Sequence, residues 1–237
     1  MIPKRFAIDY AERCLKLLEE CEPIARKHDL LGTFSVMLAS SILLVPWERA
    51  GRRHPITQEQ DLNLLPALDT LKKQKWFEAD FWAGRPPGDW RFSRIMNDPN
   101  NVGGWADEQG RRSFTASANT IERRRVGEVF RVLRNALAHG NIVYVDENGR
   151  ELTPNRVEHL AFISRYEESA EQRAQTETYR LVTVREADFL RFVRAWAHWV
   201  VEHREDGNLR DADPLGDGMD TGIGMDMAVR QQAEGFT

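Results

Sequence analysis

The sequence predicts a mainly α-helical protein in which a helical bundle carries a small antiparallel β-sheet. Apolar residues recur at helical spacing along much of the chain, which is typical of amphipathic helices packed around a core. Between about residues 141 and 184, short β-branched and aromatic runs indicate strands. Gly140 separates a helical pattern from the first of these runs, and glycine can end a helix without steric cost.

The first part of the chain contains three predicted helices. Residues 6 to 28 place apolar side chains on one face, and residues 30 to 45 are so apolar that we expect a buried central helix. This second helix is followed directly by Pro46, and it is too short to span a bilayer, which needs about 20 residues. A capping box from Thr57 to Gln60 starts the third helix. Its inward face consists of Leu62, Leu65, Leu68 and Leu71.

From about residue 74 to residue 118 the helical pattern is lost, and prolines and glycines interrupt the chain. A structureless loop of this length is unusual inside a domain. Seven of its aromatic residues could anchor it: Trp76, Phe77, Phe81, Trp82, Trp90, Phe92 and Trp105. We therefore expect an insertion whose aromatic side chains pack on the helical core. A platform on which RNA bases stack is the alternative.

The fourth predicted helix leads into residues 131 to 146, around which the rest of the chain is organised. Its apolar face consists of Val126, Val129, Phe130, Leu133 and Leu137. Arg134 lies in the last turns of this helix, and His139 lies at its end. Because residues five apart on a helix point about 140° away from each other, Arg134 and His139 are expected to flank a cleft and not to touch.

Three strands and a last helix follow. Ile142–Val145 and residues 157 to 166 alternate as strands, with a strong turn signal at Asn148-Gly149 between them, and residues 177 to 184 give a third strand. A capping box from Thr183 to Glu186 opens the last helix. Its apolar face consists of Phe189 or Leu190, Val193, Trp196 and Val200.

The charge is distributed unevenly along the chain. The net charge is −4, but residues 205 to 237 hold eight acidic residues and two arginines, so the first 204 residues are net positive by two. Between Arg111 and Arg134, seven arginines accompany two glutamates. This basic stretch is either a solvated helix face or a surface that attracts an RNA backbone.

The cysteines and the N-terminus fit a cytoplasmic protein. Cys14 and Cys21 are seven residues apart in one predicted helix, about 10 Å along its axis, which is too far for a disulfide. No cluster of cysteines and histidines suggests zinc, so we expect no metal and no cofactor. The N-terminal residues lead into an amphipathic pattern and not into the apolar core of a signal peptide.

The segment Arg134-Asn135, three residues and then His139, followed by Gly140-Asn141, resembles the signature of HEPN-domain proteins. These proteins are mostly helical, and their motif is an arginine, four to six residues and a histidine. The resemblance implies a metal-independent RNA endonuclease whose active site forms between two domains, typically across a homodimer. Without the resemblance, Arg134 would be read as a solvated helix charge and His139 as a residue that caps the helix.

The resemblance also implies roles for individual residues. His139 would transfer a proton to or from the ribose 2′-oxygen or the leaving 5′-oxygen, and Arg134 would stabilise the negative charge on the phosphorus. Asn135 is expected to hold Arg134 or a phosphate oxygen by hydrogen bonding. Three further residues are predicted to contact the substrate: Asn141, Arg131 and Glu48. Glu48 follows the apolar helix, and its alternative role is an ion pair with a neighbouring arginine.

The resemblance suggests a toxin or an anti-phage defence effector with an antitoxin or a nucleotidyltransferase as a partner. Toxins controlled by nucleotidyltransferases often carry a tyrosine two residues after the histidine, but Asn141 occupies that position here and Tyr144 lies three residues further on. The alternative function is a non-catalytic HEPN module that binds RNA, a nucleotide or a protein partner.

The sequence therefore predicts the following organisation. Residues 1–204 form one HEPN-like helical domain, with the aromatic insertion at about 74–118 and a β-hairpin or meander at about 141–184. Residues 205–237 form an acidic, glycine-rich tail that we expect to be disordered. The predicted partners are RNA and a second copy of the chain, and no membrane.

Overall fold

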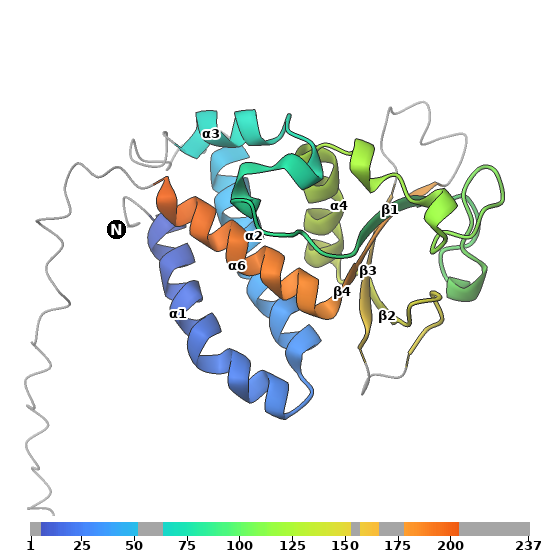
Figure 1. The fold of residues 1–237 in the computed structure, drawn as a ribbon, viewed down its shortest axis with the longest axis horizontal. Coiled ribbons are helices and arrows are strands. Elements are labelled where there is room, and N and C mark those ends of the chain that lie inside the picture. The colour runs from blue at the N-terminus through green and yellow to red at the C-terminus, as the bar shows by residue number, and fades with distance from the viewer. Residues whose placement is uncertain (1–5, 52–63, 153–156, 166–177, 204–237) are drawn as a thin grey trace, which may run out of the picture. The chain divides into compact units, whose positions relative to one another are not determined.

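The computed structural model describes residues 6–51, 64–152, 157–165 and 178–203 (Figure 1). Within this part the chain is mainly helical and carries one small antiparallel sheet, as the sequence predicts. The predicted capping box at Thr57, the inward position of Leu62 and the predicted acidic tail lie outside the described residues.

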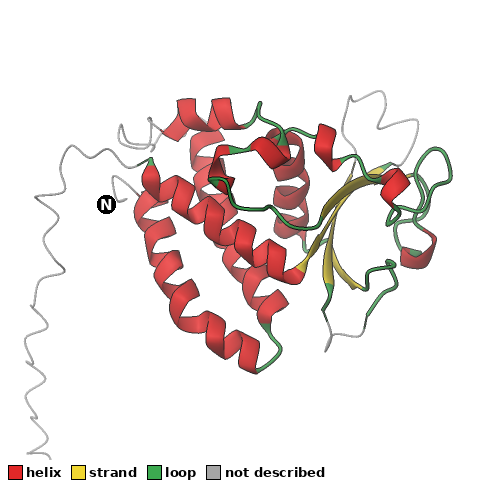
Figure 2. Cartoon of the chain, in the orientation of Figure 1, coloured by secondary structure: helices red, strands yellow, loops and turns green. Residues whose placement is uncertain are grey.

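The long helices follow the apolar patterns of the sequence closely. They are α1 (Phe6–Lys27), α2 (Leu31–Gly51), α3 (Leu64–Leu71), α4 (Val126–His139) and α6 (Glu186–Glu202). Helix α6 packs against α1 and α2, α2 also packs against α4, and α4 packs against β3 (His159–Arg165) (Figure 2). None of the helices in the described ranges combines the length and the apolarity that crossing a bilayer would require.

The sheet has four strands where the sequence predicted three. The strand order is β1-β4-β3-β2, and every neighbouring pair is antiparallel. Strands β2 (Ile142–Val145), β3 and β4 (Tyr179–Arg185) match the prediction, but β1 (Trp90–Ile95) was missed. Strand β1 lies inside the aromatic insertion and pairs with β4, Trp90 opposite Val184. A pairing between positions so far apart in the sequence leaves no local signal.

The aromatic side chains of the insertion pack into the core and are not a stacking platform. Six of the seven rings are at most 2 % exposed: Trp76, Phe81, Trp82, Trp90, Phe92 and Trp105. Trp76 lies among rings from three parts of the chain, with centroids 4.7 Å from Trp90, 5.3 Å from Phe192 and 6.1 Å from Phe130. The packing alternative is therefore confirmed, and the RNA-stacking alternative is wrong for these rings.

The sequence predicted that the second helix ends before Pro46. Helix α2 instead continues through Pro46 to Gly51. A proline inside a helix has no N–H to donate to the carbonyl four residues earlier, which here is that of Ile42. The indole Nε1–H of Trp196 on α6 donates to this carbonyl oxygen at 2.9 Å. The hydrogen bond that Pro46 cannot make is thus replaced from another helix, and Trp47 is carried on as part of α2.

The start of α6 also differs from the prediction. Thr183 is not a capping residue, because it lies within β4, where it pairs with Arg91 on one side and Ala161 on the other. The strand continues to Arg185, and the helix starts at the next residue. Tertiary pairing of the strand therefore overrides the local capping signal.

The first residue of β3 is a buried histidine, His159, which approaches Asp89 just before β1. The side chain of His159 is 7 % exposed, and its Nε2 lies 3.7 Å from an Asp89 carboxylate oxygen. Neither ring nitrogen makes a hydrogen bond within the described residues. Burial lowers the pKa of His159 below its ordinary value; the charges of Arg91 and Arg185 lower it as well, although Asp89 opposes them.

We predict that Trp196→Phe destabilises the protein by about 1–3 kcal/mol, because the buried Ile42 carbonyl then has no donor. The free energy of unfolding is measured by denaturant titration. Trp199→Phe is the matched control, since it removes an indole from the same helix that donates no hydrogen bond to the described residues. Equal destabilisation by the two variants would contradict the role of the bond.

We also predict that stability falls as the pH drops through about 6.5. Near this value His159 takes up a proton more readily in the unfolded chain, whose histidine pKa is about 6.5, than in the folded protein, where its pKa is lower. The unfolded state therefore binds more protons as the pH falls, which lowers stability. Urea midpoints at pH 5.0 and 7.5 measure the effect. His159→Gln should flatten this difference, whereas His28→Gln, on an exposed residue, should preserve it. A wild-type pH difference in His159→Gln would refute the explanation.

Candidate functional site

Helix α4 is fixed at both ends by contacts that its own sequence supplies. At its start, a carboxylate oxygen of Glu128 accepts a hydrogen bond from the backbone N–H of Arg125 at 2.9 Å, and the other carboxylate oxygen pairs with Arg124 at 3.0 Å. At its end, Gly140 has φ 71° and its N–H donates to the carbonyl of Ala136. The predicted apolar face of α4 is buried, so its polar residues lie on the remaining surface.

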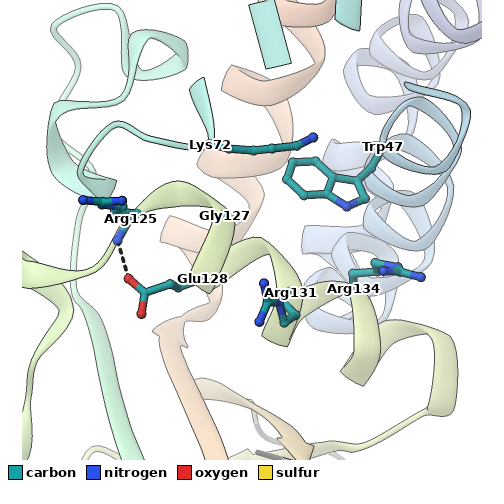
Figure 3. Close-up of a pocket in the computed structure, with 7 residues that line it drawn as sticks. All are labelled: Trp47, Lys72, Arg125, Gly127, Glu128, Arg131 and Arg134. Atoms are coloured by element: carbon teal, nitrogen blue, oxygen red, sulfur yellow. Dashed lines mark hydrogen bonds between the residues drawn. The ribbon is translucent and has the colours of Figure 1, made fainter. Parts of the chain in front are cut away.

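A pocket of about 440 Å³ opens beside this helix (Figure 3). Its walls come from the C-terminal part of α2, the segment after α3, and the stretch from Arg125 to Arg134, most of which belongs to α4. The lining residues are Trp47, Lys72, Arg125, Gly127, Glu128, Arg131 and Arg134. In this view Lys72 runs along one side of the Trp47 indole, and Arg131 and Arg134 lie along the other.

Backbone hydrogen bonds hold the segment after α3 against the start of α4. The N–H of Gly127 donates to the carbonyl of Lys72 at 3.1 Å, and the N–H of Val126 donates to that of Gln74 at 2.9 Å. A Cβ at position 127 would lie 3.2 Å from the Lys72 carbonyl oxygen. The absence of a side chain at Gly127 thus allows the approach that brings Lys72 to the pocket.

The pocket is strongly cationic. Among the side chains that the structure describes around it, Lys72, Arg125, Arg131 and Arg134 accompany one acidic residue, Glu128. Burial alone would raise the pKa of Glu128, but the backbone N–H of Arg125 and the guanidinium of Arg124 hold it below its ordinary value. Glu128 is therefore ionised and bound to these two partners. The net positive charge of the pocket favours the binding of an anion.

Trp47 provides the apolar wall of the pocket. Its indole packs on the buried ring of Phe130, with centroids 4.7 Å apart and planes 32° apart. The Nζ of Lys72 lies 5.0 Å from the centroid of the same indole and also pairs with Asp69 at 3.0 Å. An aromatic surface and several cations therefore line one cavity.

The predicted site residues do not all lie together. Arg131 and Arg134 line the pocket, Arg131 exposed and Arg134 half-buried. Asn135 is directed to the sheet instead, because its side-chain amide donates to the hydroxyl of buried Ser164 at 3.0 Å. Asn135 thus connects α4 to β3.

His139 and Asn141 lie outside the pocket, at the exposed end of α4. The backbone of Asn141 is fixed, since its N–H donates to the Ala136 carbonyl and its own carbonyl accepts from Ile163, both at 3.0 Å. The direction of Arg134 and His139 differs by about 140° around the helix, as their spacing requires. One copy of the chain therefore presents the two residues of the motif on different faces.

Glu48 lies in α2, one residue after Trp47, but its side chain is outside the described part of the structure. Its predicted contact with the substrate therefore stays a prediction. Within the described residues, no three histidine, cysteine, aspartate or glutamate side chains are grouped closely enough to hold a metal ion.

Five of the seven lining residues were not predicted from the sequence: Trp47, Lys72, Arg125, Gly127 and Glu128. Arg125 belongs to the basic stretch from Arg111 to Arg134, but the local charge does not show which of its arginines line a pocket. Trp47 follows the predicted end of a helix, and Lys72 follows Leu71, the last apolar position of the third predicted helix. Only the crossing of α2 and α4 and the backbone bonds to Lys72 bring them beside Arg134.

One comparison with known proteins identifies the family of the chain. A family model described as HEPN pEK499 p136 matches residues 1–207. No curated protein and no solved structure matches the chain.

Proposed function

Since this chain belongs to the HEPN pEK499 p136 family, we propose that it is a metal-independent RNA endonuclease that cleaves through the ribose 2′-hydroxyl. The observation that carries the proposal is the accessibility of the motif. His139 is exposed and Arg134 is half-buried beside a cationic pocket, although both sit on a helix whose opposite face is fully buried. A purely structural role would not require an arginine and further cations around one cavity.

The proposed reaction needs no nucleophile from the protein. The 2′-oxygen attacks the phosphorus, the bond from phosphorus to the 5′-oxygen breaks, and a 2′,3′-cyclic phosphate is left. His139 removes the 2′-hydroxyl proton or donates a proton to the leaving 5′-oxygen. The planar guanidinium of Arg134 stabilises the negative charge that builds up on the phosphate oxygens.

Other polar residues assist these two. Asn135 acts as a positioning residue, because its hydrogen bond to Ser164 holds α4, and with it Arg134, against the sheet. Arg131, one turn before Arg134, adds positive charge to the same pocket and attracts the RNA backbone. Asn141 contributes a side-chain amide at the exposed end of the helix, next to His139.

We further propose that the active site is completed by a second copy of the chain. In one copy His139 does not line the pocket that contains Arg134. A two-fold axis near the exposed ends of both α4 helices would bring two arginines and two histidines to one phosphodiester. The predicted homodimer would thus unite residues that one helix separates.

The second candidate function is a non-catalytic HEPN module that binds RNA or a nucleotide. The position of His139 outside the pocket favours it, because a cationic pocket with an aromatic wall binds phosphate without any acid or base. In both cases the protein could serve as a toxin or defence effector with an antitoxin partner. Tyr144 is partly buried against the core, which makes control by nucleotide transfer to this side chain less favourable.

We predict that His139→Ala lowers RNA cleavage by about 10²–10⁴-fold, because it removes proton transfer. Arg134→Lys should also lose most activity, because a point charge does not replace a planar fork. Cleavage is measured in excess EDTA, with product ends analysed for 2′,3′-cyclic phosphate, and a substrate with 2′-deoxyribose at the cleaved position should survive.

The matched controls for these variants are His28→Ala and Arg123→Ala, which remove an exposed histidine at the end of α1 and an exposed arginine outside the pocket. Both should cleave RNA at about the wild-type rate. If folded His139→Ala also cleaved at the wild-type rate, the assignment of this residue would be wrong. RNA binding without cleavage by the wild type would favour the second candidate function.

We predict a homodimer in solution, with twice the 27.4 kDa mass of one chain by light scattering. Arg134 and His139 on different faces of one helix make a single copy an incomplete nuclease. A monomer that still cleaves RNA at the measured concentration would contradict the shared active site.

A further inference from the structure

The pocket beside Arg134 has two chemically different walls. Its cationic wall is formed by Arg131 and Arg134, which are three residues apart on α4 and therefore neighbours on the helix surface. Its apolar wall is the indole of Trp47, supplied by α2. A ligand that fits both walls must combine an anionic group with a flat, apolar group.

The indole of Trp47 is rigidly supported. Phe130, with 0 % of its surface exposed, packs against it at 4.7 Å, and Phe130 is itself held by Trp196, 4.9 Å away. A ring held in this way loses little conformational freedom when a ligand stacks on it. Trp47 is thus suited to act as a stacking surface, unlike the buried rings of the insertion.

Lys72 covers the indole, and its side-chain contacts with the described residues are weak. Its Nζ lies 5.0 Å from the ring centroid and pairs with Asp69, whose side chain is 68 % exposed. Exposed cation–π contacts and exposed ion pairs contribute little stability. A planar base can therefore displace the Lys72 side chain from Trp47, and the displaced ammonium remains near enough to interact with a phosphate.

We propose that this pocket binds one unpaired nucleotide, with its base on Trp47 and its phosphate against Arg131 and Arg134. Its volume of about 440 Å³ lies within the usual range for small-molecule sites. The inference rests on the proposed function in taking RNA as the ligand, and it adds the substrate class. A base that stacks on Trp47 cannot be paired in a helix, so the substrate is single-stranded or looped RNA.

The test measures RNA binding in a His139→Ala background, so that cleavage does not interfere. A fluorescent single-stranded RNA octamer and a duplex of the same sequence are titrated by anisotropy. Adding Trp47→Leu, which keeps an apolar contact with Phe130, should weaken single-strand binding by about 5- to 150-fold, the range found for one stacked base. Duplex binding should change by less than about twofold.

Two further variants separate stacking from charge. Arg131→Ala should weaken single-strand binding and lower its salt dependence, because one phosphate contact is lost. Arg123→Ala removes an exposed arginine outside the pocket and should affect the single strand and the duplex equally. Equal loss of both RNA forms in Trp47→Leu, or no loss in a folded variant, would overturn the nucleotide pocket.

A second measurement does not depend on how well Trp47→Leu folds. Wild-type protein bound to a single-stranded RNA that contains 4-thiouridine is irradiated and digested with trypsin. Crosslinks should appear in the peptide of residues 28–49, which contains Trp47. Crosslinks confined to other peptides would overturn the proposal.

A third arm identifies the source of the nucleotide. Adenosine 3′,5′-bisphosphate is titrated by calorimetry, and Trp47-dependent binding as tight as that of the octamer would assign the pocket to a free nucleotide. Binding that depends on Trp47 in a protein that never cleaves RNA would keep this inference and remove the proposed function. RNA cleavage without any Trp47-dependent binding would keep the proposed nuclease function and overturn the nucleotide pocket.

Discussion

The burial of Phe130 is the constraint on which the rest of the site depends. Its ring contacts Trp196 and Phe192 of α6, Trp76 and Phe81 of the insertion, and Trp47 of α2. These contacts set the rotation of α4 about its own axis. Once Phe130 points into the core, Arg131 and Arg134 must lie beside Trp47, and His139 must lie on another part of the surface.

A second constraint is the continuation of α2 beyond Pro46. The missing helical hydrogen bond at the Ile42 carbonyl would leave a buried acceptor without a donor, and Trp196 supplies that donor. The same tryptophan packs against Phe130. One side chain therefore supports both the helix that carries the aromatic wall of the pocket and the helix that carries its arginines.

The basic stretch from Arg111 to Arg134 is not a uniform charged face. Arg111 pairs with Asp107, and Arg124 pairs with Glu128 while its guanidinium lies 4.4 Å from the ring centroid of Phe92. These arginines serve the structure. Arg125 and Arg131 are exposed at the pocket, and they give it the positive potential that an RNA phosphate would meet.

The sequence by itself determined the elements whose signals are local. The apolar period of α4, the stop at Gly140 and the strand β2 follow from residues within one turn or one strand of each other, and so does the spacing that keeps Arg134 and His139 apart. Only the tertiary structure decided the features that need distant partners. Strand β1 exists because β4 pairs with it, α2 passes Pro46 because Trp196 donates to Ile42, and Lys72 reaches the pocket because Gly127 leaves room. Each depends on a contact between residues far apart in the chain, and such contacts leave no pattern in the neighbouring sequence.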